Sequence, residues 1–373
     1  MYQLSNIKTI FALTTMLFFL SACGGVSSSD SVSDGSTLTS IQSSKATLKG
    51  RVKDKDTGKG LGRVKVSIGE STTTTDTDGN FELSDLNESD SEIVTFESEG
   101  YVDSSVAVNI DEPSEDNTAS SNYLEISMDG YDSETYYMSQ DDIVIDATNG
   151  ATISILSSTK YVDDSGTIFN GNITAQASYI NVTTETGREV FPGEYEGVDS
   201  SGSIVLFVSY GAISFALKDD SGNQLDLSGI ATITFPSLGL PEQDIIPLWY
   251  YDYSQGLWIE EGYAELQEDG TYQGGISHSG TWSLNKPIED VPGIYRSRIV
   301  YKNGDPATTV KVHAVGSNWI RTDLSTDEDG VFEIEVIPGS TFKLKAYDYT
   351  NKYEAVYDGT MPAIASGEIS AEI

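Results

Sequence analysis

The feature that most constrains the fold of this chain is a two-residue alternation of apolar and polar side chains. Successive side chains of a strand point to opposite faces, so this period is typical of strands with one buried face. No window after the first 23 residues predicts an amphipathic helix. The alternation is clearest at Leu48-Gly50-Val52, Val64-Val66-Ile68, Phe81-Leu83, Val106-Val108-Ile110 and Leu124-Ile126-Met128.

Turn signals separate these runs at short intervals. Pairs of Asp or Asn with Gly favour positive φ angles and close hairpins between antiparallel strands. Closely spaced antiparallel strands favour sandwiches over barrels. The sequence therefore predicts an all-β chain of tandem β-sandwiches, with turns at Asp78-Gly79, Asn149-Gly150, Asp269-Gly270, Asn303-Gly304 and Asp329-Gly330.

The charge excludes one class of partner. The 373 residues include 58 acidic and 21 basic side chains, a formal net charge of −37. Such a chain repels nucleic acid and anionic lipid headgroups, so we expect no nucleic-acid partner. The same charge suits solubility, salty surroundings or cation binding, and composition does not separate these three.

Stability has to come from packing, because the sequence contains a single cysteine, Cys23. One cysteine cannot form an internal disulfide. A chain of this length has room for two or three domains with cores of ordinary size.

The N-terminal segment has the layout of a signal peptide. Lys8 supplies a positive charge, and the apolar run from Ile10 to Leu20 is well short of the ~20 residues that a bilayer-spanning helix needs. Leu20-Ser21-Ala22-Cys23 follows the run directly. Together they resemble a bacterial lipoprotein signal, with residues 1–22 as the signal peptide.

This resemblance implies cleavage before Cys23 and lipid on its thiol. Several acyl chains would give a stable membrane anchor. Gly24 stands where lipoproteins kept in the inner membrane usually carry Asp, so the resemblance implies the outer membrane, with its face left open. The alternative is a secreted protein cleaved near Ala22 with an idle cysteine.

Residues 23–45 are rich in Ser, Gly and Asp and poor in large apolar side chains. A segment of this composition buries too little surface to offset the entropy of ordering. We expect a flexible tether between the anchor and the folded body.

An internal repeat flanks a different middle region. Thr75 to Leu83 matches Thr326 to Ile334, and a Val-Lys-Val strand precedes each copy. This run, with its Gly or Pro turn and Thr-Asp-x-Asp-Gly-x-Phe, resembles the carboxypeptidase regulatory-like domain. The resemblance implies seven-stranded transthyretin-like sandwiches over residues 46–128 and 292–373.

The middle region, residues 129–287, has its own series of landmarks. The landmarks include Phe191-Pro192-Gly193-Glu194-Tyr195, Ile246-Pro247-Leu248-Trp249, Gly256-Leu257-Trp258 and Ser277-His278-Ser279-Gly280-Thr281-Trp282. This series is similar to modules of bacterial surface lipoproteins and of animal extracellular proteins such as cartilage intermediate layer protein. The similarity implies an extracellular β-rich module without a reaction, and Gly280 stands where the family often has an aromatic residue.

The acidic turns are the candidate metal sites. Asp76, Asp78, Asp327 and Asp329 offer the oxygen ligands that Ca²⁺ prefers. The spacing argues against an EF-hand, because the Gly comes immediately after the second Asp instead of after three alternating ligands. The alternative interpretation is that the first Asp of each pair binds its own turn backbone.

The aromatic residues suggest a ligand platform. Trp249, Tyr251 and Tyr253 share one face of a strand, and Trp258 follows nearby. Amphipathic rings of this kind suit stacking on sugars or peptides. The alternative is that one face fills the sandwich core while the other packs on a neighbouring domain.

No residue is a convincing catalyst. His278 and His313 lie in different expected modules and outside any nucleophile motif. The sequence therefore predicts a non-enzymatic lipoprotein of the cell envelope that binds glycans or proteins at the surface, as in adhesion. An accessory subunit of an envelope enzyme or transporter is the alternative, and a calcium-binding structural protein is a further one.

Overall fold

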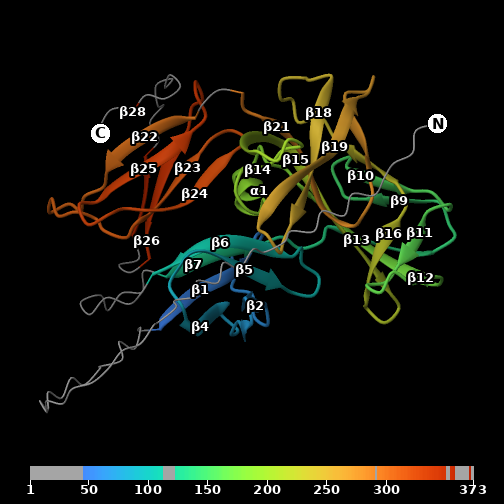
Figure 1. The fold of residues 1–373 in the computed structure, drawn as a ribbon, viewed down its shortest axis with the longest axis horizontal. Helices are drawn as coiled ribbons and strands as arrows, with labels where there is room; N and C mark the ends of the chain where they lie inside the picture. The colour runs from blue at the N-terminus through green and yellow to red at the C-terminus, as the bar shows by residue number, and fades with distance from the viewer. Residues whose placement is uncertain (1–44, 112–121, 290–291, 350–352, 358–368, 371–373) are drawn as a thin grey trace, which may run out of the picture. The chain divides into compact units, whose positions relative to one another are not determined.

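The computed structural model describes residues 45–111, 122–289, 292–349, 353–357 and 369–370, all within the unit Ser44–Ile373. Strands make up nearly all of its regular structure, as Figure 1 shows, which confirms the all-β prediction. The helix α1 (Glu185–Glu189) is the one helix of the described ranges. Thr184 caps it by accepting a hydrogen bond from Gly187 N, a cap that the two-residue alternation did not indicate.

The N-terminal strands form a sandwich of two sheets, with the orders β4-β1-β7 and β3-β2-β5-β6. Alternate residues of both sheets meet in one buried core, among them Val52, Phe81, Val66 and Phe96. The seven strands are β1 (Ala46–Asp54), β2 (Lys65–Ile68), β3 (Ser71–Thr74), β4 (Asn80–Leu86), β5 (Ser89–Glu97), β6 (Ser104–Ile110) and β7 (Tyr123–Met128).

The first and last strands of this sandwich pair in parallel. β1 and β7 run side by side from Lys49↔Tyr123 to Asp54↔Met128. A hairpin cannot make such a pair, so the chain crosses the whole sandwich before returning to β1. The other edge of β7 has no partner strand among the described residues.

The C-terminal strands repeat this arrangement strand for strand. Their sheets have the orders β25-β22-β28 and β24-β23-β26-β27, and β22 pairs in parallel with β28. The internal repeat of the sequence thus corresponds to two sandwiches of equal topology. The strands are β22 (Gly293–Arg298), β23 (Lys311–Val315), β24 (Ile320–Ser325), β25 (Val331–Val336), β26 (Lys343–Asp348), β27 (Tyr353–Tyr357) and β28 (Ile369–Ser370).

The middle strands belong to one 14-stranded sheet in which β15 pairs with β13, β14, β16 and β21. A bulge between Ser209 and Ala212 breaks the register of β15. The strands are β8 (Ser133–Met138), β9 (Ile143–Asp146), β10 (Thr152–Ile155), β11 (Lys160–Val162), β12 (Ile168–Phe169), β13 (Asn172–Ile180), β14 (Glu196–Val198), β15 (Ile204–Asp219), β16 (Gln224–Ser228), β17 (Ala231–Phe235), β18 (Ile245–Asp252), β19 (Leu257–Leu266), β20 (Tyr272–Ile276) and β21 (Gly280–Pro287).

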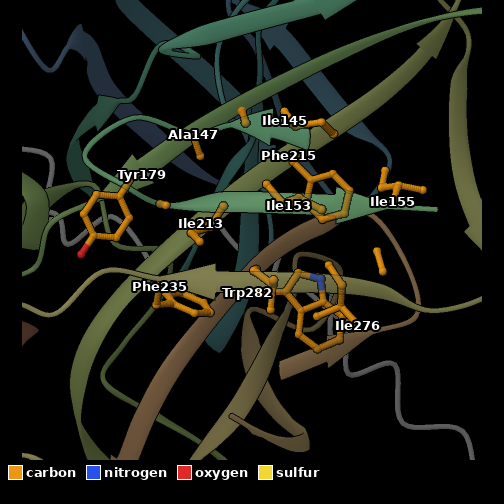
Figure 2. Close-up of a cluster of buried hydrophobic side chains, with 14 of the residues drawn as sticks. Ile145, Ala147, Ile153, Ile155, Tyr179, Ile213, Phe215, Phe235, Ile276 and Trp282 are labelled. Atoms are coloured by element: carbon orange, nitrogen blue, oxygen red, sulfur yellow. The ribbon is translucent and has the colours of Figure 1, made fainter. Parts of the chain in front are cut away.

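The middle sheet encloses its own apolar core. Figure 2 shows Ile153 of β10, Ile213 and Phe215 of β15 and Trp282 of β21 projecting into a shared interior. Trp282 is 1% exposed, and its Nε1 donates to His278 O at 3.1 Å. Burial with a satisfied donor makes this ring part of the core rather than of a surface.

Candidate functional site

The two repeated acidic turns have the same geometry. Asp76 Oδ1 accepts hydrogen bonds from Asp78 N at 2.9 Å and from Asn80 N at 2.8 Å. Hydrogen bonds from Asn80 lower the pKa of Asp76. Gly79 supplies φ 83°, and a Cβ there would collide with Val52 O.

In the second copy, Asp327 Oδ1 accepts from Asp329 N at 2.9 Å and from Val331 N at 2.8 Å. The first Asp of each pair thus binds its own turn, as the alternative interpretation has it. No group of three or more His, Cys, Asp or Glu able to hold a metal ion occurs in the described ranges. Calcium at these turns stays an untested prediction.

The aromatic residues of the expected platform are mostly buried. Trp249, Tyr251 and Trp258 are each 0% exposed, and Tyr253 is partly buried. Trp249 Nε1 donates to Asn285 O at 2.9 Å, and Trp258 Nε1 donates to Pro192 O at 2.8 Å.

Packing accounts for the rings on this face of β18 and for Trp258 of β19. The three buried rings belong to a cluster that continues into the core of the C-terminal sandwich. Tyr251 OH lies 3.0 Å from Ser105 Oγ of the N-terminal sandwich, and Tyr253 OH lies 2.6 Å from Thr281 Oγ1. The structure therefore corrects the platform prediction, because no ring face of Trp249, Tyr251 or Trp258 is open to a ligand.

Each histidine has a structural environment. His278 Nε2 lies 3.1 Å from Glu261 Oε2, and its Nδ1 lies 3.0 Å from Ser279 O. Burial lowers the pKa of His278, but the contact with Glu261 outweighs it and the pKa is raised overall. His313 is partly buried near Lys345, and desolvation above all lowers its pKa to about 4.

The structure adds a feature that sequence reasoning missed, a cleft of about 1040 Å³. Its walls come from segments far apart in the sequence, including β6, β7, α1 and β26. Five consecutive residues of β7, Tyr123 to Ser127, line it. Neighbouring strand residues point to opposite faces, so the strand edge itself must face the cleft.

Tyrosine rings form one part of the cleft lining. Tyr123 and Tyr349 lie 4.7 Å apart between ring centroids, and Tyr349 stacks on Tyr347 at 5.9 Å with an interplanar angle of 9°. All three rings are partly exposed. An exposed aromatic surface therefore exists, but it lies at these three tyrosines and not at Trp249 and Trp258, where the sequence predicted it.

Charged side chains of both signs form another part. Lys53 pairs with Glu125 on neighbouring strands, and Lys345 pairs with Glu185 of α1. Desolvation by burial would lower the pKa of Lys345, but its carboxylate partners raise it, so it stays charged. The cleft is therefore polar and ionic along its walls, with apolar residues at the strand edges.

Cys23, the expected lipidation site, lies outside the described residues, as does the whole of residues 1–44. In the described part of the chain, no helix is both long and apolar enough to cross a bilayer.

The comparisons with known proteins identify one segment. Residues 47–122 match the family model of the carboxypeptidase regulatory-like domain, which confirms the resemblance for the first copy of the repeat. No curated protein matches the chain.

Solved structures give only weak similarity. The major pilin subunit BcpA of Bacillus cereus is 10% identical, with a TM-score of 0.20, covering 88% of this chain and 98% of its own. A protein of unknown function from Bacteroides fragilis is 8% identical, with a TM-score of 0.18, covering 65% and 98%. The Streptococcal ancillary pilin is 8% identical, with a TM-score of 0.15, covering 87% and 98%. Scores this low establish no common fold with any of these proteins.

Proposed function

We propose that this chain is a non-catalytic binding protein of the cell envelope, whose ligand site is the cleft lined by β6, β7, α1 and β26. The observation that carries the proposal is the cleft itself. It combines about 1040 Å³ of space with partly exposed tyrosine rings, paired charges and the edge of β7, which has no partner strand within the described ranges. Concave sites with a few convergent polar groups and aromatic walls are the usual form of a binding site.

The site residues support binding better than turnover. His278 contacts Glu261 and Ser279 O, and His313, which lines the cleft, has its pKa lowered to about 4 by desolvation and by the nearby charges of Lys345 and Lys311. The acidic turns use their carboxylates to close hairpins. These contacts favour a role in binding over catalysis. The β-sandwich fold by itself assigns no reaction, because the same fold serves many functions.

The proposed location rests on the N-terminal sequence. Cys23 would carry the lipid and hold the protein at the outer membrane, and residues 23–45 would act as the tether. Growth with labelled palmitate tests this part. Label on the full chain that is lost in Cys23→Ser supports it, and an unlabelled chain in the soluble fraction would contradict it.

The ligand is then a glycan or a protein of the surface or the envelope. The detergent-solubilised full chain, applied to glycan and matrix-protein arrays, tests binding directly. Substituting Tyr123→Ala should weaken capture, whereas Tyr263→Ala, on an exposed strand position outside the cleft, should not. Binding that ignores both substitutions would refute the cleft as the site.

The accessory role is the second candidate function. The match of residues 47–122 to the carboxypeptidase regulatory-like domain supports it, because we expect such modules to accompany an envelope enzyme or transporter. Affinity purification from native membranes distinguishes the two. One stable, stoichiometric envelope partner would favour the accessory role over free surface binding.

A further inference from the structure

The open edge of β7 points to one kind of ligand. β7 pairs with β1 on one side, and no strand of the described ranges lies on the other. Lys49 N donates to Asn122 O at 2.9 Å, and Lys55 N donates to Met128 O at 3.0 Å. Backbone groups of a strand alternate in direction, so those of Tyr123, Glu125 and Ser127 point away from β1.

These outward groups face the cleft, because the same three residues line it. Unpaired edge N–H and C=O groups are a template for another strand, and proteins usually cover them or block them with bulges or proline. Here the described part of the chain leaves the edge uncovered over three outward-facing residues. An added strand of about six residues would match its length.

The side chains beside the edge alternate as an added strand requires. Leu124 and Ile126 are partly buried against the core of the N-terminal sandwich, and Val106 of β6 lies with them. Tyr123 and Glu125 lie on the opposite face of β7, next to Lys53. An added strand would thus set one row of side chains on apolar residues and the other on charged and aromatic ones.

The charge of the protein determines which side chains suit the row of the added strand that lies on charged and aromatic residues. The cleft lining holds seven acidic and five basic side chains, and the chain as a whole carries a formal net charge of −37. A field of this sign draws cationic segments and repels anionic ones. Basic side chains therefore suit the polar row of the added strand.

From this geometry we infer that the cleft takes an extended peptide segment of alternating apolar and basic residues, added as a strand to the free edge of β7. This inference rests on the proposed function and names its ligand class. Main-chain hydrogen bonds would supply affinity, and the alternating rows would supply specificity.

The test uses the immobilised full chain and three synthetic peptides. The first alternates valine and lysine, the second has the same composition in two blocks, and the third is the first with N-methyl groups on alternate backbone nitrogens. The alternating peptide should bind. The block peptide and the N-methyl peptide should each bind about tenfold or more weakly, because they lose the side-chain rows or the main-chain donors.

Two proline variants locate the site. Ser127→Pro removes an outward N–H of β7 without removing a bond to β1, and should weaken the alternating peptide about tenfold. Glu82→Pro is the matched control, on the edge of β4 that no strand of the described residues pairs with and outside the cleft, and should leave binding unchanged. Calorimetry should show that both variants unfold at the temperature of the unaltered chain to within a few degrees.

The outcomes separate the inference from the proposed function. Equal binding of the three peptides, or binding insensitive to Ser127→Pro, would overturn the added strand. Capture of glycans that Tyr123→Ala weakens, with no peptide binding, would overturn the peptide class and leave the cleft as a binding site. Loss of all array binding would remove the proposed function as well.

Discussion

A substitution at Trp258 tests whether the aromatic residues around it form a buried core or an exposed surface. The side chain is 0% exposed, its ring stacks on Phe191 at 4.8 Å, and its Nε1 donates to Pro192 O. Substituting Trp258→Ala would empty this position. A core residue and a surface residue differ widely in the cost of such a change.

The magnitude follows from the buried area. A tryptophan buries about 200 Å², which at about 25 cal/mol per Å² is about 5 kcal/mol. Measured Trp→Ala changes in cores cost about 3–5 kcal/mol, and leaving Pro192 O without its donor adds about 1 kcal/mol. We therefore expect the free energy of unfolding to fall by about 4–6 kcal/mol.

The assay is urea unfolding followed by far-UV circular dichroism, supported by calorimetry. Tyr263→Ala is the matched control, an aromatic truncation on the same strand at a side chain that is 57% exposed. We expect it to change the free energy of unfolding by no more than about 0.5 kcal/mol. If Trp258→Ala costs as little as the control, the ring is a surface feature and the assignment to the core is refuted.

Three further predictions concern charges. Because hydrogen bonds from Asn80 hold the pKa of Asp76 below its ordinary value of 3.8, the turn contributes stability that is complete above that pH and lost as the pH falls below it. Asp76→Ala should therefore lower the unfolding midpoint at pH 7 and lose that effect in acid, and a deficit unchanged by pH would contradict this. Lys55 Nζ lies 2.5 Å from the buried Asp129 Oδ1, so Lys55→Met should cost about 3–5 kcal/mol in urea unfolding, with partial recovery in Lys55→Met/Asp129→Leu. Proton NMR titration should find His313 with a pKa of about 4 and His278 above its ordinary 6.5, and two coincident curves would disprove their different burial and contacts.

Much of the local structure was predictable because it depends on neighbours in the sequence. The alternation at Val64-Val66-Ile68 predicts a strand, and β2 (Lys65–Ile68) buries Val66 and Ile68. The Asp-Gly pairs predict hairpin turns, and both Asp76 and Asp327 close them through their own backbone neighbours. Such interactions span four residues and need no knowledge of the rest of the chain.

The candidate site was predictable only in part. The sequence marked Trp249 and Trp258 as binding residues because aromatic rings suit both cores and surfaces. Periodicity places them on strands but does not say what covers those strands, and the structure buries both rings in a cluster that continues into the C-terminal sandwich. Tyr123 and Tyr349, more than two hundred residues apart, carried no signal that would bring their rings together.

By itself the sequence determined the class of the fold, the repeat, the turns and the net charge, since each follows from residue types within a few positions of one another. Tertiary structure alone decided that β7 returns to pair in parallel with β1, leaving its outer edge unpaired within the described ranges. It also decided that this edge lines a concave cleft instead of a flat part of the surface. The physical reason is that strand order and edge exposure depend on contacts between distant segments, and a two-residue period is the same for an edge strand as for a central one.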